Sequence, residues 1–361
     1  MPSKLNREAE YLNALFSLTL SPAQAGRAIS LVASLTPDER SEFASLADSH
    51  HVLVRGLNTI VEQATRDDGT VLAQWASGEL EKEHKRISTA LVYLEHICEE
   101  LENAHCPTTV MKSLDHYPDL GNDLDLYSTA DEGAICEVMT GKFNAHIEAR
   151  SWGDRLAHKW NFAVPGLKES VEIHIQRLGQ MGEHIALARR FVTRRVLKVV
   201  EDKTYYVPAP EERIIVATLQ RMYRHFYFRV CDIVNSAAII ESGELNFEEL
   251  KRSTEAAGIW PGVATYLAVV SDHVKRYRGA PLALPDFVFA AARFGGNQIR
   301  ARARFLRVPV LPYGAALYTY QVTQAAARGD VPATFRLSLL PYLASAAALA
   351  YKMTGSDKGV W

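Results

Sequence analysis

The sequence predicts an α+β fold in which a small mixed β-sheet lies between an N-terminal and a C-terminal helical region. Three observations support this prediction. Apolar residues recur at helical spacing up to about residue 104, short alternating segments follow, and helical spacing returns after residue 207. We therefore expect a helical region at 1–104, a sheet-containing core at 105–207 and a helical domain at 208–361.

Composition places the chain among ordinary globular proteins. It has 361 residues, of which 48% are hydrophobic and 23% charged. Residues 1–16 lack the apolar stretch of a signal peptide, and the apolar run at 337–351 contains Pro341 and is shorter than a bilayer span. We expect no membrane association.

The cysteines favour a cytoplasmic protein with reduced thiols. No pair of them has the C-x-x-C spacing of a zinc site, and their number and spacing do not suggest a disulfide framework. The four are Cys98, Cys106, Cys136 and Cys231.

The N-terminal helices carry recognisable start signals. Ser21 followed by Pro22, and Thr36 followed by Pro37, are typical of an N-cap and a first helical position. A long amphipathic helix is predicted to end near Cys106. Its apolar stripe consists of Ile87, Leu91, Leu94 and Ile97.

The core is predicted to begin at Thr108, where the apolar period changes. We expect strands at 108–111, 123–128, 146–151, 156–164 and 170–176 and a helix at 132–143. A turn at Gly153 and Asp154 is expected to join the third and fourth strands.

Paired acids interrupt the second predicted strand. Asp123 and Asp125 alternate with Leu124 and Leu126, so both carboxylates are expected on one face while the leucines face the core. Two carboxylates this close repel each other unless a cation lies between them. The alternative is a pair of solvated acids on an edge strand.

A third acid lies on the last predicted strand. In 170–176, Glu172 and His174 are predicted to share the polar face. Three carboxylates on neighbouring strands supply the hard oxygen ligands that Mg²⁺ prefers. The acids therefore predict a magnesium site, whereas a solvated strand face is the alternative for Glu172 and His174.

These residues resemble the nucleotidyltransferase superfamily, which has a polymerase-β-like fold. Its signature is an apolar residue, Gly and Gly/Ser, a spacer, and Asp-apolar-Asp/Glu-apolar. Here Met111 is the apolar residue, Ser113 takes the Gly/Ser place, and nine residues separate Ser113 from Asp123. The core at 105–207 would be the nucleotidyltransferase core.

A narrower resemblance is to the bacterial "uncharacterised nucleotidyltransferase" family, over roughly residues 35–290. The chain is similar to it in three short motifs that occur in the same order. They are Met111-Lys112-Ser113, Tyr117-Pro118-Asp119 and Glu172-Ile173-His174.

The resemblance implies an enzyme that transfers a nucleoside monophosphate from an NTP, most often ATP, to a hydroxyl or amine and releases pyrophosphate. Mg²⁺ or Mn²⁺ would be the cofactor. Asp123, Asp125 and Glu172 would be the catalytic metal ligands, with Glu172 also able to accept a proton. The acceptor remains open among a small molecule, a protein side chain and an RNA end.

Other roles follow from the same motifs. Lys112 and Ser113 would bind the nucleotide, and His174 would contact substrate. Lys112 departs from the superfamily pattern, which has glycine there; either its charge meets the phosphates or the turn is reworked. The active site is expected between the core and the C-terminal helices.

The alternative function is a non-catalytic nucleotide- or RNA-binding regulatory protein that retains the fold. Residues 271–361 contain 12 Lys and Arg but 4 Asp and Glu, which suggests an anionic partner or a solvated basic surface. Helical spacing is predicted through 211–240, and Arg300, Arg304 and Arg307 are predicted to share a helical face.

Overall fold

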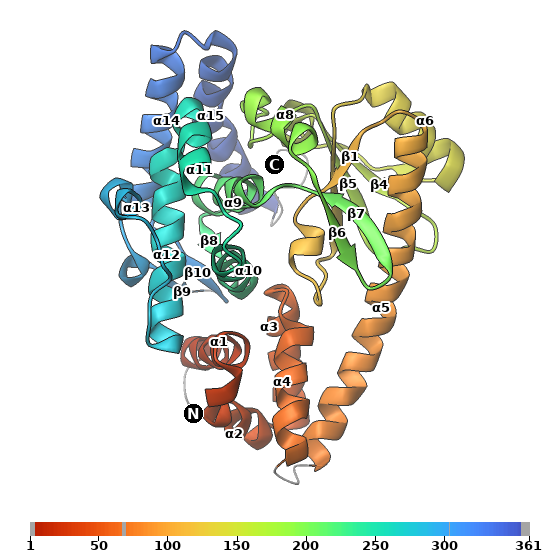
Figure 1. Ribbon diagram of the computed structural model, residues 1–361, viewed down its shortest axis with the longest axis vertical. Helices are drawn as coiled ribbons and strands as arrows, with labels where there is room; N and C mark the ends of the chain where they lie inside the picture. Colours follow the sequence, from red (N-terminus) through yellow and green to blue (C-terminus); the bar gives the residue numbers. More distant parts are fainter. Residues whose placement is uncertain (1–3, 67–69, 303, 355–361) are drawn as a thin grey trace.

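The computed structural model describes residues 4–66, 70–302 and 304–354, and it confirms an α+β fold (Figure 1). A mixed sheet has the strand order β1-β2-β5-β4-β3, in which β2 and β5 are parallel and the other pairs antiparallel. Its strands are β1 (Thr108–Val110), β2 (Asp123–Ser128), β3 (His146–Ile147), β4 (Lys159–Ala163) and β5 (Ser170–Ile175).

The N-terminal region is helical, as predicted. The Thr36 start is confirmed, because Thr36 and Glu39 form a reciprocal capping box. Ser21 instead precedes a short 3₁₀ turn, and its hydroxyl donates to the carbonyl of Tyr277 at 2.7 Å rather than capping a helix. The helices are α1 (Lys4–Leu20), α2 (Gly26–Ser34), α3 (Pro37–Ser49), α4 (Leu53–Arg66) and α5 (Thr70–Asn103).

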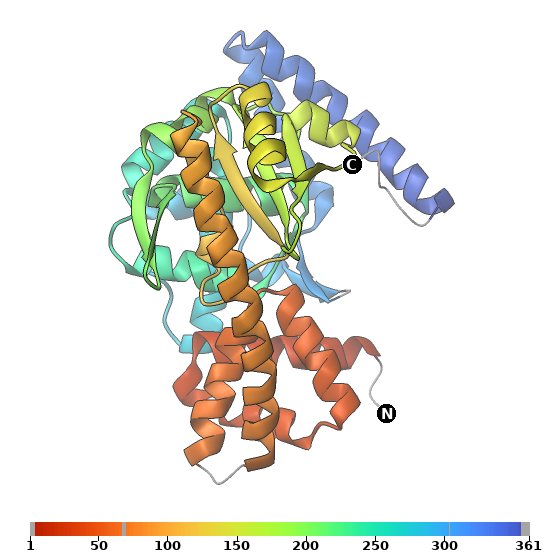
Figure 2. The same ribbon diagram turned by 90° about the vertical axis from the view of Figure 1, so that its right-hand side faces the viewer.

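The long helix α5 connects the N-terminal helices to the sheet. It starts beside α4 and runs across one face of the sheet (Figure 2). Its predicted stripe is fully buried, as are Leu124 and Leu126 of β2 and Val171 and Ile173 of β5. The core therefore lies between α5 and the sheet, and the acids of β2 and β5 are left to the opposite face.

Two details of the core differ from the sequence prediction. The expected turn at Gly153 and Asp154 is part of α7 (Trp152–Ala157), which begins at a capping box between Ser151 and Asp154. The expected strand at 146–151 is correspondingly reduced to His146–Ile147. The predicted helix is confirmed as α6 (Glu132–Phe143).

A second small sheet was not predicted. After α8 (Ile185–Thr193), the antiparallel strands β6 (Val196–Val200) and β7 (Lys203–Val207) form a hairpin. The exposed Val196, Leu197 and Val199 explain the omission, since they give the segment no alternation of buried and exposed positions.

The predicted continuous helical spacing at 211–240 is wrong. The chain forms α9 (Pro210–Thr218), a π-helical turn (Leu219–Arg224) and β8 (Tyr227–Phe228) before α10 (Val230–Glu241). Tertiary pairing overrides the local period here, because β8 pairs with β10 and Phe228 is fully buried against Tyr266.

The rest of the C-terminal region is mainly helical. The expected helical face of Arg300, Arg304 and Arg307 is wrong, because these arginines lie on or between two short paired strands. The elements are α11 (Phe247–Ala257), α12 (Trp260–Arg278), α13 (Asp286–Ala291), β9 (Arg300–Arg302), β10 (Phe305–Arg307), α14 (Ala315–Ala327) and α15 (Val331–Thr354). Within the described residues, every helix is too short or too polar to cross a bilayer.

Candidate active site

The candidate site is built on the parallel pair β2 and β5. In their register, Asp125 lies opposite Glu172 and Tyr127 lies opposite His174. Directly opposed residues share a face of a sheet, and Asp123 lies on the same face two residues before Asp125. The strand pairing thus gathers the predicted acids on one surface.

The turn before β2 is tied to the strand by Ser113. Its Oγ accepts a hydrogen bond from the backbone N–H of Asp125 at 2.9 Å and donates to the carbonyl of Asp123 at 3.2 Å. Lys112 has a positive φ of 52°, which turns the chain from β1 into a 3₁₀ turn at Ser113–Asp115. The motif residues therefore fix the backbone that carries both aspartates.

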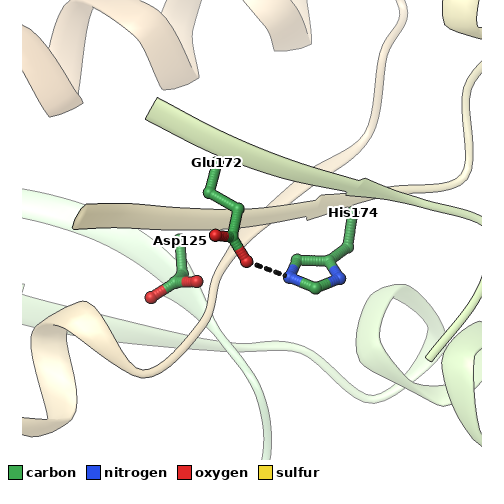
Figure 3. A group of neighbouring side chains, drawn as sticks. All are labelled: Asp125, Glu172 and His174. Atoms are coloured by element: carbon green, nitrogen blue, oxygen red, sulfur yellow. Dashed lines mark hydrogen bonds and ion pairs between the residues drawn. The ribbon is translucent and has the colours of Figure 1, made fainter. Parts of the chain in front are cut away.

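Asp125, Glu172 and His174 form the acid–histidine group. One potential ligand atom from each lies within 4.8 Å of those of the others. Figure 3 shows the side chains of Glu172 and His174 side by side, with Glu172 Oε1 2.7 Å from His174 Nε2. Asp123 is more exposed and lies outside this group, although it occupies the same strand face.

Two lysines neutralise these acids. The ammonium of Lys112 forms an ion pair with Asp125. Lys159 Nζ lies 3.0 Å from Glu172 Oε2 and 2.8 Å from Asp154 Oδ1. Neither Lys159 nor Asp154 was predicted to lie at the site, because only the pairing of Lys159 with His174 on neighbouring strands brings that lysine to the acids.

The two buried acids have pKa values shifted in opposite directions. Burial raises the pKa of Asp125 to about 7, and the negative charge of Glu172 adds to this effect against the attraction of Lys112. Burial also disfavours ionised Glu172, but the His174 hydrogen bond and the charges of Lys112 and Lys159 hold its pKa well below the usual range. Glu172 is therefore the permanently ionised member.

The pKa values of His174 and Asp123, which lie beside the two buried acids, are also shifted. Burial lowers the pKa of His174, so the imidazole is neutral near pH 7. Burial and the charge of Glu172 both raise the pKa of Asp123. Among the described residues, no group hydrogen-bonds to the buried Nδ1 of His174, which leaves one ring nitrogen available to a ligand.

The donor set fits a divalent cation. The carboxylates of Asp125 and Glu172 lie close together, and Asp123 lies on the same strand face. The ammonium groups of Lys112 and Lys159 already pair with the first two acids. Carboxylate oxygens suit Mg²⁺ or Mn²⁺, whereas an imidazole nitrogen is less favoured by Mg²⁺. Asp123, Asp125 and Glu172 would hold such an ion, and His174 would orient Glu172 through its hydrogen bond.

A small pocket adjoins the site where the core meets the C-terminal region. Its volume is about 40 Å³. We call it the junction pocket; it is lined by Met111, Lys112, His174, Leu178, Gly179, Gln180, Val216, Leu219, Gln220 and Arg224. Arg224 and Gln220 were not identified from the sequence, since their place depends on the unpredicted π-helical turn.

Comparisons with known proteins give a distant likeness. No family model matches the chain, and no curated protein matches it in sequence. A similar solved structure is an antigenic nucleotidyltransferase-like protein from Paracoccidioides brasiliensis. It is 15% identical, the alignment covers 57% of this chain and 97% of that chain, and the TM-score is 0.35.

Proposed function

We propose that the protein is a metal-dependent nucleotidyltransferase. It transfers a nucleoside monophosphate, with ATP as the expected donor, to a hydroxyl or amine acceptor and releases pyrophosphate. The observation that supports this most is the parallel pairing of β2 with β5, which places Asp125 opposite Glu172 beside a turn anchored by Ser113.

The reaction forms a bond between the acceptor oxygen or nitrogen and the α-phosphorus. The bond from the α-phosphorus to the bridging oxygen breaks, pyrophosphate leaves with its electron pair, and the acceptor proton passes to solvent. When bound, Mg²⁺ or Mn²⁺ supplies positive charge to the phosphates of the transition state. Catalysis of this kind depends mainly on positioning and electrostatics.

The proposed site divides metal binding, positioning of the strand and phosphate binding among its residues. Asp123, Asp125 and Glu172 hold the cation. Glu172 is a poor proton acceptor because its pKa is held low by His174 and the lysines, so we assign it to metal binding alone. Ser113 positions the strand, and Lys112 contributes positive charge to the phosphates.

A second candidate is a non-catalytic nucleotide-binding protein. The ion pairs of Lys112 with Asp125 and of Lys159 with Glu172 favour it, because internal cations can satisfy the acids permanently. In that case nucleotide would bind without turnover.

The test is pyrophosphate release from each of the four NTPs with Mg²⁺ or Mn²⁺, with a cell extract as the source of acceptors. Wild type is compared with Asp125→Asn and Glu172→Gln, each checked for folding by circular dichroism. The matched control is Glu137→Gln, an exposed carboxylate on α6. With a labelled NTP, the labelled product identifies the acceptor in the extract, and the assay is then repeated with that acceptor in pure form.

Metal-dependent release that is lost in both site variants and kept in Glu137→Gln supports the transferase. Removal of one such charged ligand should reduce turnover at least about a hundredfold. Nucleotide binding by the wild type without release from any NTP would reject the transferase and favour the binding protein.

A further inference from the structure

The junction pocket is positively charged. Its lining contains the cationic side chains of Lys112 and Arg224 and the neutral ring of His174, and no aspartate or glutamate of the described residues lines it. Two lining residues connect the pocket to the carboxylates, because Lys112 pairs with Asp125 and His174 contacts Glu172. A pocket of this charge favours an anionic group that reaches toward a cation site.

Arg224 differs from two neighbouring arginines in that no carboxylate pairs with it among the described residues. Nearby, Arg221 Nε lies 2.7 Å from Asp232, and Arg213 Nε lies 2.6 Å from Asp115. Among the described residues, Arg224 has no ion-pair partner, and its buried Nε has no hydrogen bond. A buried donor without a partner is costly, so this guanidinium is prepared for an acceptor from outside the chain.

The backbone explains how Arg224 reaches the pocket. It is the last residue of the π-helical turn Leu219–Arg224, and π turns often occur at functional sites. The wider turn lets a residue of the C-terminal region approach the β5 face, where the positive charge of Arg224 acts on Lys159.

We propose that Arg224, at the mouth of the junction pocket, binds a terminal phosphate group of the nucleotide's polyphosphate tail. This inference rests on the proposed function for the identity of the ligand. A guanidinium presents donors that match phosphate oxygens, and Lys112 provides a second positive charge from the core side. The phosphates therefore bridge the nucleotidyltransferase core and the C-terminal region, and they place the α-phosphorus toward the acids.

The ion pair of Lys112 makes this arrangement dependent on cation binding. One ammonium cannot serve Asp125 and a phosphate equally well, and Lys112 contacts Asp125 while also lining the pocket. No carboxylate of the described residues competes for Arg224 in this way. We therefore expect Arg224 to give the larger part of the affinity for polyphosphate when divalent ions are removed.

The experiment measures the binding of inorganic tripolyphosphate by calorimetry in EDTA. Wild type, Arg224→Gln and Arg224→Lys are compared, with Arg276→Gln on the exposed face of α12 as the control. Thermal unfolding verifies that each variant is folded. We expect at least tenfold weaker binding in Arg224→Gln, partial retention in Arg224→Lys and no change in Arg276→Gln.

The outcomes separate this inference from the proposed function. Loss of tripolyphosphate binding in folded Arg224→Gln supports the inference even if no turnover is found. Equal binding by wild type and Arg224→Gln overturns it, and so does failure of the wild type to bind tripolyphosphate at all. Pyrophosphate release that persists in those two cases would leave the proposed transferase intact.

Discussion

The hydroxyl of Ser113 accepts a hydrogen bond from the backbone N–H of Asp125, with 2.9 Å between Oγ and N. The same hydroxyl donates to the carbonyl of Asp123, so one side chain contacts the backbone on both sides of Leu124. This explains why a small hydroxyl residue is useful at this turn. Ser113 fixes the strand that carries two proposed metal ligands.

Replacement of Ser113 by alanine should destabilise the protein. Ser113 is almost fully buried, so the substitution leaves the N–H of Asp125 without its acceptor. A buried polar group that loses its partner costs about 1–3 kcal/mol. Urea unfolding of Ser113→Ala should show this loss in the free energy of unfolding.

The matched control is Ser41→Ala, an exposed serine on α3. Its effect should stay within about 0.5 kcal/mol. Equal stabilities of the two variants would contradict the role assigned to the Ser113 hydrogen bonds.

Replacement of Lys112 by methionine should strengthen the binding of Mn²⁺. The Lys112 ammonium and a divalent ion compete for Asp125, and the substitution removes the internal competitor while keeping an apolar stem of similar length. We expect a several-fold lower dissociation constant by calorimetry at pH 8. The pKa of Asp125 is about 7 with Lys112 in place, and loss of the lysine charge raises it, so proton competition works against the gain at pH 8 and the gain should increase at higher pH.

Lys85→Met, an exposed lysine on α5, is the control for the loss of one positive charge. Mn²⁺ affinity that is unchanged in Lys112→Met, or changed equally in both variants, would show that Lys112 does not compete with the ion.

Local patterns in the sequence were enough to predict the strand that carries the paired acids and the face that Asp125 shares with Glu172. Strict alternation gave the boundaries of β2, and the faces assigned to Asp125 and Glu172 agree with their register. Lys159 and Arg224 escaped prediction for physical reasons. The first reaches the acids only through pairing with β5, and the second through a π-helical turn whose apolar spacing imitates a continuous helix.

Loss of Asp232 should be strongly destabilising. Its carboxylate pairs with buried Arg221 and accepts the backbone N–H of Arg229 at 2.6 Å, at the start of α10. Removing one partner leaves a buried, uncompensated guanidinium, which costs about 3–5 kcal/mol. Chemical unfolding of Asp232→Ala should show this decrease.

An exposed ion pair provides the comparison. Glu79 pairs with Lys82, whose side chain is 74% exposed, so Glu79→Ala should change the free energy of unfolding by less than about 1 kcal/mol. Similar losses in Asp232→Ala and Glu79→Ala would refute the structural importance of the buried pair.

Acid should destabilise the protein through His50, which joins the N-terminal helices to α10 and to the β9–β10 turn. Its Nδ1 accepts the N–H of Val230 at 3.0 Å, and its Nε2 lies 2.8 Å from the carbonyl of Arg304. This arrangement requires a neutral ring with the proton on Nε2. Burial, together with the charge of Arg229, lowers the pKa of His50 to about 4 despite the Arg304 bond.

The direction of the pH effect follows from proton binding. Histidine in the unfolded chain titrates near pH 6.5, so below that pH the unfolded chain binds more protons than the folded one. The contribution of His50 to stability is complete above about pH 6.5 and falls as the pH decreases to about 4, where roughly 3 kcal/mol is lost. Urea unfolding across this range should show the decrease.

His50→Asn separates this effect from other titrations. The amide oxygen of asparagine can accept the N–H of Val230 without titrating, whereas the contact with Arg304 is lost. The variant should be less stable than wild type at pH 8 but lose less stability on acidification. His84→Asn, an exposed histidine on α5, should keep the wild-type slope. A slope in His50→Asn as steep as in wild type would mean that other groups cause the acid sensitivity, because protonation of His50 is then absent.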